Sequence, residues 1–119
     1  MKSTKLFGSL VLVTAISGCA TGNMPTNEIA EAKIHISTAE ADKSEQFAAQ
    51  HLATAKEHQG KAQTAVDKSE FNKARRFAEK ATADAKLASA QARSESTKQK
   101  LYELNATLIQ LKQTIDQDS

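Results

Sequence analysis

The chain beyond Pro25 is almost free of helix-breaking residues, and this feature limits its fold most strongly. No further proline follows, and Gly60 is the only glycine after that point. Alanine, the best helix former, dominates the same stretch, and apolar residues recur there at three- and four-residue spacing. This spacing places the apolar residues on one face of an α-helix. The sequence therefore predicts an all-α protein built from long helices.

Two helices are expected, over residues 28–66 and 70–116, paired as a long antiparallel hairpin that resembles a coiled coil. The polar segment Asp67–Phe71 interrupts the apolar pattern and is expected to form the turn. In the first helix the apolar stripe breaks around residues 42–46 and resumes about a quarter of the way around the helix. In the second, an alanine seam ends at the polar run 94–100. A second apolar seam then follows: Leu101, Leu104, Leu108, Leu111 and Ile115.

The hairpin turn sets a register between the two predicted helices. If the turn centres near residue 68, residue n faces a partner at about 137 minus n. The break near residue 43 then lies opposite the one near residue 94, and Leu101, Leu104 and Leu108 face residues 36 to 29. The leucine seam would be intramolecular core, although three heptads could also pair with another chain. Because burying alanine contributes little, a lone hairpin would be marginally stable, which favours self-association or a partner helix.

The first 18 residues form a separate segment. Lys2 and Lys5 precede an apolar run over residues 6–16, which small residues follow. A basic head, a short apolar run and a small-residue cleavage site are typical of a secretory signal. The run is too short to span a membrane, because a spanning helix needs about 20 residues. We therefore expect residues 1–18 to be a cleaved signal peptide.

Ile16-Ser17-Gly18-Cys19 resembles the bacterial lipobox, an aliphatic residue and two small ones before a cysteine. The resemblance implies that signal peptidase II recognises Ile16, Ser17 and Gly18. It also implies a diacylglyceryl group on Cys19, usually with an acyl chain such as palmitate on its amine, and two or more chains anchor a protein stably. Residues 19–27 would be the lipidated cysteine and a flexible tether. Lipoproteins retained in the inner membrane commonly carry aspartate next, so Ala20 implies the outer membrane and its periplasmic face.

Charge and chemistry exclude several function classes. Removing residues 1–18 takes away Lys2 and Lys5, so 14 basic residues face 14 acidic ones, and no nucleic-acid partner is expected. Three histidines, His35, His51 and His58, are 16 and 7 residues apart, whereas ligands on one helix need three- or four-residue spacing. No phosphate-binding loop, nucleophile elbow or cysteine cluster is present in the sequence. We expect no metal, no cofactor besides the covalent lipid, no catalytic residue and no enzymatic activity.

Residues 68–81, Lys-Ser-Glu-Phe-Asn-Lys-Ala-Arg-Arg-Phe-Ala-Glu-Lys-Ala, and Asp84–Ala88 carry a further resemblance. Together with the alanine-rich segment before them, they resemble short alanine-rich lipoproteins of the Gram-negative envelope, a domain-of-unknown-function family. Similar segments also precede OmpA-like domains. The resemblance covers roughly residues 28–93 and implies paired helices around an aromatic-containing turn. It brings no catalytic residues.

Basic residues gather around the predicted turn, and five are candidate partner contacts: Lys68, Lys73, Arg75, Arg76 and Lys80. An ordinary charged helix surface is the favoured interpretation, because charge pairs at this spacing are common. Alternatively, the turn is a membrane-distal knob that contacts an acidic envelope protein or peptidoglycan.

Together these features predict an outer-membrane lipoprotein with a periplasmic α-hairpin (residues 28–119), serving as a non-enzymatic structural or interaction module of the cell envelope. One alternative is an adaptor or activator of a periplasmic enzyme. Another is a Braun-type trimeric coiled coil. Covalent linkage to peptidoglycan is not expected, because the chain ends in Asp116-Gln117-Asp118-Ser119 and not in lysine.

Overall fold

The computed structural model describes residues 22–118, and that part of the chain is helical without strands. It comprises α1 (Thr26–Ala41), the single-turn α2 (Ser44–Phe47), α3 (Ala49–Asp67) and the long α4 (Phe71–Gln117). The predicted all-α class is confirmed. The expected signal peptide and lipidation site, Ile16, Ser17, Gly18 and Cys19, lie outside the described residues.

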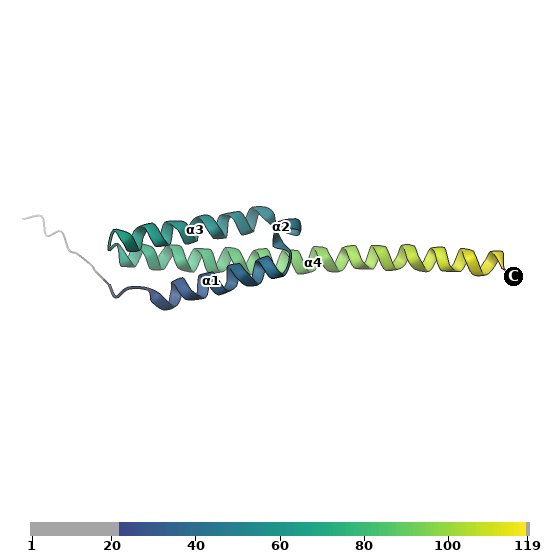
Figure 1. Cartoon of the computed structure of the whole chain (residues 1–119), viewed down its shortest axis with the longest axis horizontal. Coiled ribbons are helices and arrows are strands. Elements are labelled where there is room, and N and C mark those ends of the chain that lie inside the picture. The colour runs from purple at the N-terminus through teal and green to yellow at the C-terminus, as the bar shows by residue number, and fades with distance from the viewer. Residues whose placement is uncertain (1–21, 119) are drawn as a thin grey trace, which may run out of the picture.

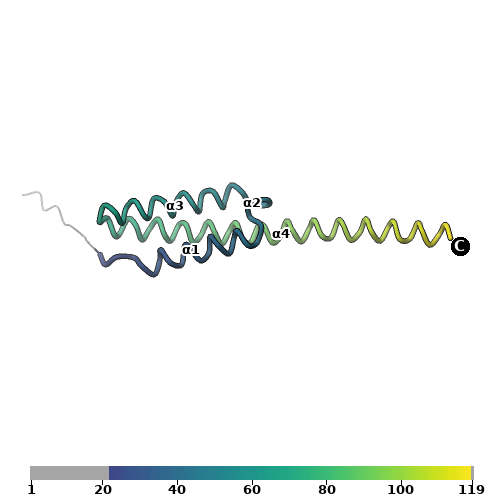
Figure 2. The backbone as a smooth tube through the Cα atoms, in the orientation of Figure 1, coloured from purple at the N-terminus to yellow at the C-terminus, as the bar shows by residue number. Residues whose placement is uncertain are grey.

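The predicted antiparallel hairpin is formed by α3 and α4, which a short turn joins (Figure 1). α1 lies along the same first part of α4 and runs in the same direction as α4. Ion pairs show this direction, since Glu28 near the start of α1 meets Arg75 and Asp42 just beyond its end meets Arg93. Three helices therefore lie side by side along the first part of α4, and the rest of α4 extends beyond them as a single rod (Figure 2).

The single helix expected over residues 28–66 is corrected by this arrangement, because the chain reverses at residues 42–48. α1 ends at Ala41, and Lys43 adopts a left-handed conformation with φ 63°, where its N–H donates a hydrogen bond to the Glu40 carbonyl (3.0 Å). A left-handed residue just after a helix is a common stop signal, but glycine usually occupies it. Here neither glycine nor proline marks the break. Its only traces in the sequence are the polar run and the quarter-turn shift of the stripe.

The reversal also changes which residues face each other. Between α3 and α4 the predicted register holds along the whole hairpin, since Gln91 Nε2 donates to the Phe47 carbonyl (3.4 Å) at one end and Lys61 lies over the Phe77 ring nearer the turn. Residues 29–36, however, fold back alongside the bundle and do not reach Leu101–Leu108. As a result every described residue of α4 after Gln99 is exposed, and the predicted packing of large side chains near the tether does not form.

The core of the bundle consists mainly of alanine. Ile36 and Leu52 are its only large buried aliphatic side chains among the described residues. The alanines buried on α4 follow three- and four-residue spacing, as the sequence predicts: Ala74, Ala78, Ala81, Ala85, Ala88 and Ala92. Side chains this small let helix backbones approach closely. Close contact of backbones, and not a thick layer of apolar side chains, therefore holds the three helices together.

The turn between α3 and α4 closes the last carbonyls of α3 through the backbone. Ser69, with φ 57°, donates its N–H to the Val66 carbonyl, and Glu70 donates to the Ala65 carbonyl, both at 2.8 Å. This pair of bonds is the Schellman motif, in which the residue after the helix cap is left-handed. The turn is thus set by local hydrogen bonding at the position where the sequence predicts it.

Replacing Lys43 with glycine should raise the free energy of unfolding by about 0.5–1 kcal/mol, because glycine adopts the left-handed conformation without the penalty that Cβ imposes. The matched control is Lys33→Gly, an exposed position inside α1, which should lower it by about 1 kcal/mol. Urea unfolding followed by circular dichroism measures both. Equal destabilisation by the two substitutions would contradict the reversal at Lys43.

Substituting leucine for Ala85, which is fully buried, should destabilise the bundle by about 1–3 kcal/mol, since a larger side chain forces the helix backbones apart. Ala83 is two residues away on the exposed side of α4, so Ala83→Leu should change stability by less than about 0.5 kcal/mol. Thermal unfolding of the two variants tests this difference. A stable Ala85→Leu variant would show that α4 does not contact its neighbours as closely as described.

Candidate interaction surfaces

The five basic residues predicted as partner contacts lie together at one end of the bundle, on the turn and the first turns of α4. Lys68, Lys73, Arg76 and Lys80 are exposed, and Arg75 is partly buried. Two of the five are held in ion pairs: Lys73 with Glu70 (2.9 Å) and Arg75 with Glu28 (2.7 Å). The charges that this end presents most openly are therefore those of Lys68, Arg76 and Lys80.

Arg75 connects this end to the start of the chain. Its Nε donates to Glu28 of α1, and its Nη2 donates to the carbonyl of Asn23, at 3.3 Å. The pKa of the Glu28 carboxyl is held below its usual value, first by a hydrogen bond from the backbone N–H of Glu28 and then by the hydrogen bond from the Arg75 side chain. The sequence could not show these contacts, because they join segments that are about 50 residues apart.

The tether enters the bundle at the basic end. Pro25 is buried, and a Cβ on Gly22 would approach Asn72 Oδ1 to 2.6 Å, so the backbone at Gly22 lies directly against the start of α4. The interpretation of the turn as a membrane-distal knob assumed one helix over residues 28–66, which would carry the turn away from the tether. The reversal at Lys43 removes that separation. The basic turn and the incoming tether lie at the same end, opposite the C-terminal rod (Figure 1).

A further polar contact joins α3 to α4 about halfway along the bundle. His58 Nδ1 lies 2.7 Å from Asp84 Oδ2, and the His58 ring stacks on Phe77 with centroids 6.1 Å apart. Lys61 and Lys80 lie over the same Phe77 ring, 5.9 and 5.8 Å from its centroid. Within residues 22–118, no group of three or more histidine, cysteine or acidic side chains is arranged to hold a metal ion. His58 thus joins α3 to α4, although the predicted register would have set it opposite residue 79 and not Asp84.

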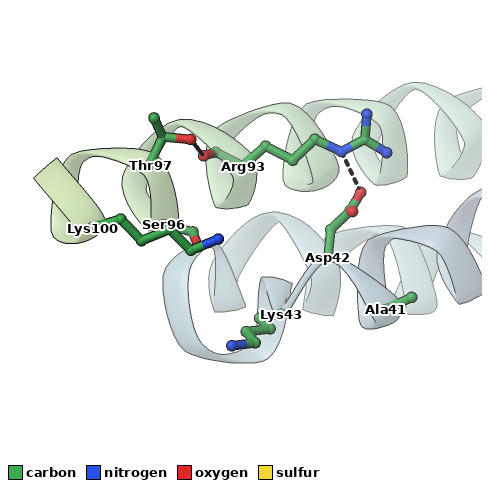
Figure 3. A pocket seen from close by; sticks show the side chains of 7 residues that line it. All are labelled: Ala41, Asp42, Lys43, Arg93, Ser96, Thr97 and Lys100. Atoms are coloured by element: carbon green, nitrogen blue, oxygen red, sulfur yellow. Dashed lines mark hydrogen bonds and ion pairs between the residues drawn. The ribbon is translucent and has the colours of Figure 1, made fainter.

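An open hollow of about 380 Å³ lies at the elbow where α4 leaves the bundle. Figure 3 shows Arg93 of α4 reaching across to Asp42, the residue just after the end of α1. Asp42 accepts hydrogen bonds from Arg93 Nε (2.8 Å) and from the Ser89 hydroxyl. Arg93 foremost, then Ser89, hold the pKa of the Asp42 carboxyl below its ordinary value. This contact fixes the end of α1 on α4, and the remaining residues line the hollow around it: Ala41, Lys43, Ser96, Thr97 and Lys100.

Most of the large apolar side chains that are exposed among the described residues lie on the rod. Its seam, residues Leu101, Leu104, Leu108, Leu111 and Ile115, is 55–61% exposed. The intramolecular role expected for this seam is corrected, since neither α1 nor α3 reaches it. Leu101 follows the buried Ala92 by nine residues, or two and a half helical turns, so the seam begins on the opposite side of α4 from Ala92. An apolar strip of this length on a free helix marks an interaction surface.

No helix in the described part of the chain is long and apolar enough to cross a membrane.

Asp42→Asn should destabilise the protein at neutral pH, because it removes the carboxylate that Arg93 and Ser89 bind. A depressed pKa means that the ionised carboxylate stabilises the fold above the pKa of the unfolded chain, and that this contribution is lost as pH falls through the folded-state pKa. The difference in urea midpoint between wild type and variant should therefore be largest near pH 7 and narrow below about pH 4. Asp116→Asn, on the exposed rod, is the matched control and should show little difference at either pH. A constant difference across this range would contradict the role of the charge.

Residues 27–104 match a known protein family that is described as a domain of unknown function, DUF4398. No curated protein and no solved structure matches the chain. The matched range takes in the whole bundle, its elbow and the beginning of the leucine seam. It also includes residues 28–93, over which the sequence resembles a domain-of-unknown-function family. Since the match covers more than half of the 119 residues, the chain belongs to the DUF4398 family.

Proposed function

We propose that the protein is an outer-membrane lipoprotein, anchored through Cys19 at the periplasmic face, that serves as a non-enzymatic structural or interaction module of the cell envelope. The sequence from Ile16 to Cys19 supports the anchor. The observation that carries the proposal is the docking of residues 22–25 at one end of an elongated helical body whose other end runs free. A body of this form suits a protein held at one end and used at the other.

The short connection between lipid and bundle places the basic end next to the membrane. Gly22 is the third residue after Cys19, which allows at most about 11 Å between their Cα atoms. In this proposal Lys68, Arg76 and Lys80 lie close to the headgroup layer. Each basic residue near an anionic lipid surface contributes about 1 kcal/mol of attraction. The basic end would therefore attract the bundle to the membrane surface. In this proposal the contact with a partner is made by the rod and not by the basic residues of the turn.

The rod extends in the opposite direction. With a rise of about 1.5 Å per residue, the 47 residues of α4 span about 70 Å. α4 would thus carry the leucine seam away from the basic end and from the lipid. We propose a non-enzymatic role because charged side chains of the bundle are used to join one helix to another. These pairs are Arg75 with Glu28, Arg93 with Asp42, and His58 with Asp84.

The exposed seam also favours the proposed alternatives, since both need an apolar contact outside the bundle. An adaptor would offer the seam to a periplasmic enzyme, and a Braun-type protein would pair it with further copies. The lipid anchor is common to all three proposals, so its test comes first.

In cells treated with globomycin, an inhibitor of signal peptidase II, the uncleaved precursor should accumulate, as it should for Cys19→Ala without the inhibitor. Mass spectrometry of the native protein should show an N-terminal Cys19 carrying acyl chains. Ala20→Asp should shift the protein to the inner-membrane fraction, and Ala20→Ser should leave it in the outer membrane. Unaffected processing, or an unmodified N-terminus, would overturn the anchor.

A further inference from the structure

The geometry of α4 points to a second copy of this chain as the partner of the rod. We propose that the leucine seam pairs with the same seam of another molecule, in parallel and in register, as a two-stranded coiled coil over residues 101–115. The proposal specifies the interaction surface of the envelope module, but it rests on the described residues alone and holds whether or not Cys19 is lipidated.

The spacing of the seam is that of a coiled coil. Steps of three, four, three and four residues place Leu101, Leu108 and Ile115 at heptad position a, and Leu104 and Leu111 at position d. Polar residues bound these five layers on both sides, since Thr97 occupies the preceding d position and Asp118 the following one. In register, each apolar layer meets the same apolar layer and each polar layer meets a polar one. The seam is therefore complementary to itself, as a two-fold interface requires.

The bundle leaves room for the second chain. Two heptads before Leu101 and Leu104, the a and d positions are Leu87 and Ala90, both exposed on the bundle portion of α4. Leu87 follows the buried Ala78 by nine residues, so it too lies half a turn away from the core. Neither α1 nor α3 therefore covers Leu87 and Ala90, and these a and d positions stay open to a second α4.

The exposed area suffices for a specific contact. More than half of each seam side chain is exposed, on the order of 100 Å² apiece. Five such side chains from each of two copies bring the buried area to the order of 1,000 Å², which is the size at which a specific protein interface begins. One chain leaves this surface in water, and two chains remove it.

The residues that flank the seam favour the parallel direction. In a parallel pair, position g contacts position e of the next heptad, so Lys100 would face Asn105 and Thr107 would face Lys112. Neither contact brings like charges together. An antiparallel pair with Leu101 opposite Leu111 would set Lys98 against Lys112 of the second copy, and Ile115 against the polar Thr97. The other antiparallel register, with Leu108 opposite Leu111, would set Leu101 against Asp118. In the parallel pair, Arg93 of one chain would also approach Lys98 of the other, one heptad before the seam. Their charges are already compensated within each chain, because Arg93 pairs with Asp42 (2.8 Å) and Lys98 with Glu95 (2.7 Å).

The mass of the full chain, purified in mild detergent, tests the pairing. Sedimentation corrected for bound detergent should give two chains per particle. Leu108→Asp, which places a charge in the central layer, should halve this mass. The matched control is Ile109→Asp, which replaces an equally exposed aliphatic residue outside the seam and should leave the mass at two chains. Both positions lie beyond the bundle, so circular dichroism should show the bundle intact in each variant.

Every other outcome contradicts the proposal. A wild-type mass of one chain would leave the seam to a different protein, such as a periplasmic enzyme, and a mass of three would indicate a Braun-type trimer. Loss of pairing in Ile109→Asp as well as in Leu108→Asp would exclude the seam as the interface. The lipidation measurements above are separate, so failure of the anchor and failure of the pairing can be told apart.

Disulfide cross-linking in membranes tests the direction and register. Leu104→Cys should form a covalent dimer on mild oxidation, since the same d position of two parallel chains comes together. Ala106→Cys, at the outward-facing f position, should not, and wild type reports any background from Cys19. A mixture of Leu101→Cys and Leu111→Cys chains should give no cross-link between the two variants. Efficient cross-linking in that mixture would show an antiparallel pair and overturn the proposed direction.

Discussion

The architecture depends on alanine packing along one side of α4. Because each buried CH₂ contributes only about 0.8 kcal/mol, an alanine core gains little from burial, and its advantage lies in the close approach of helix backbones. Close approach in turn brings longer polar side chains within reach across the helix boundaries. Arg75 reaches Glu28, His58 reaches Asp84 and Lys86 reaches Glu31. Small residues inside and ion pairs outside thus act together.

The reversal of the chain at residues 42–48 determines how far along α4 this packing extends. At Lys43 the chain leaves α1, and the Asp42–Arg93 ion pair fixes the end of that helix on α4. Since α1 turns back here, both partner helices cover only the first part of α4. One local conformational choice therefore decides that the bundle is short and broad, and that neither α1 nor α3 covers the remainder of α4 (Figure 1).

How much the sequence could predict follows from the range of each signal. The turn at residues 67–71 was predictable because a local break in the apolar pattern coincides with it, and the alanine seam from Ala74 to Ala92 was predictable from its spacing. The reversal at Lys43 was not predictable, because no glycine or proline marks it. An uninterrupted helix that contains a polar run would have much the same sequence pattern. The exposure of the seam at Leu101 depends on that reversal, a relation between distant segments that periodicity cannot reveal. The contacts of the tether with Arg75 and Asn72 were equally out of reach.

α4 is unbroken from the basic end to the C-terminal end, with neither glycine nor proline between Phe71 and Gln117. A helix without such a hinge bends only gently. It therefore acts as a lever, and a tilt of one degree at the bundle displaces the far end of α4 by about 1 Å. A movement of the bundle is thus carried along α4 to its C-terminal end.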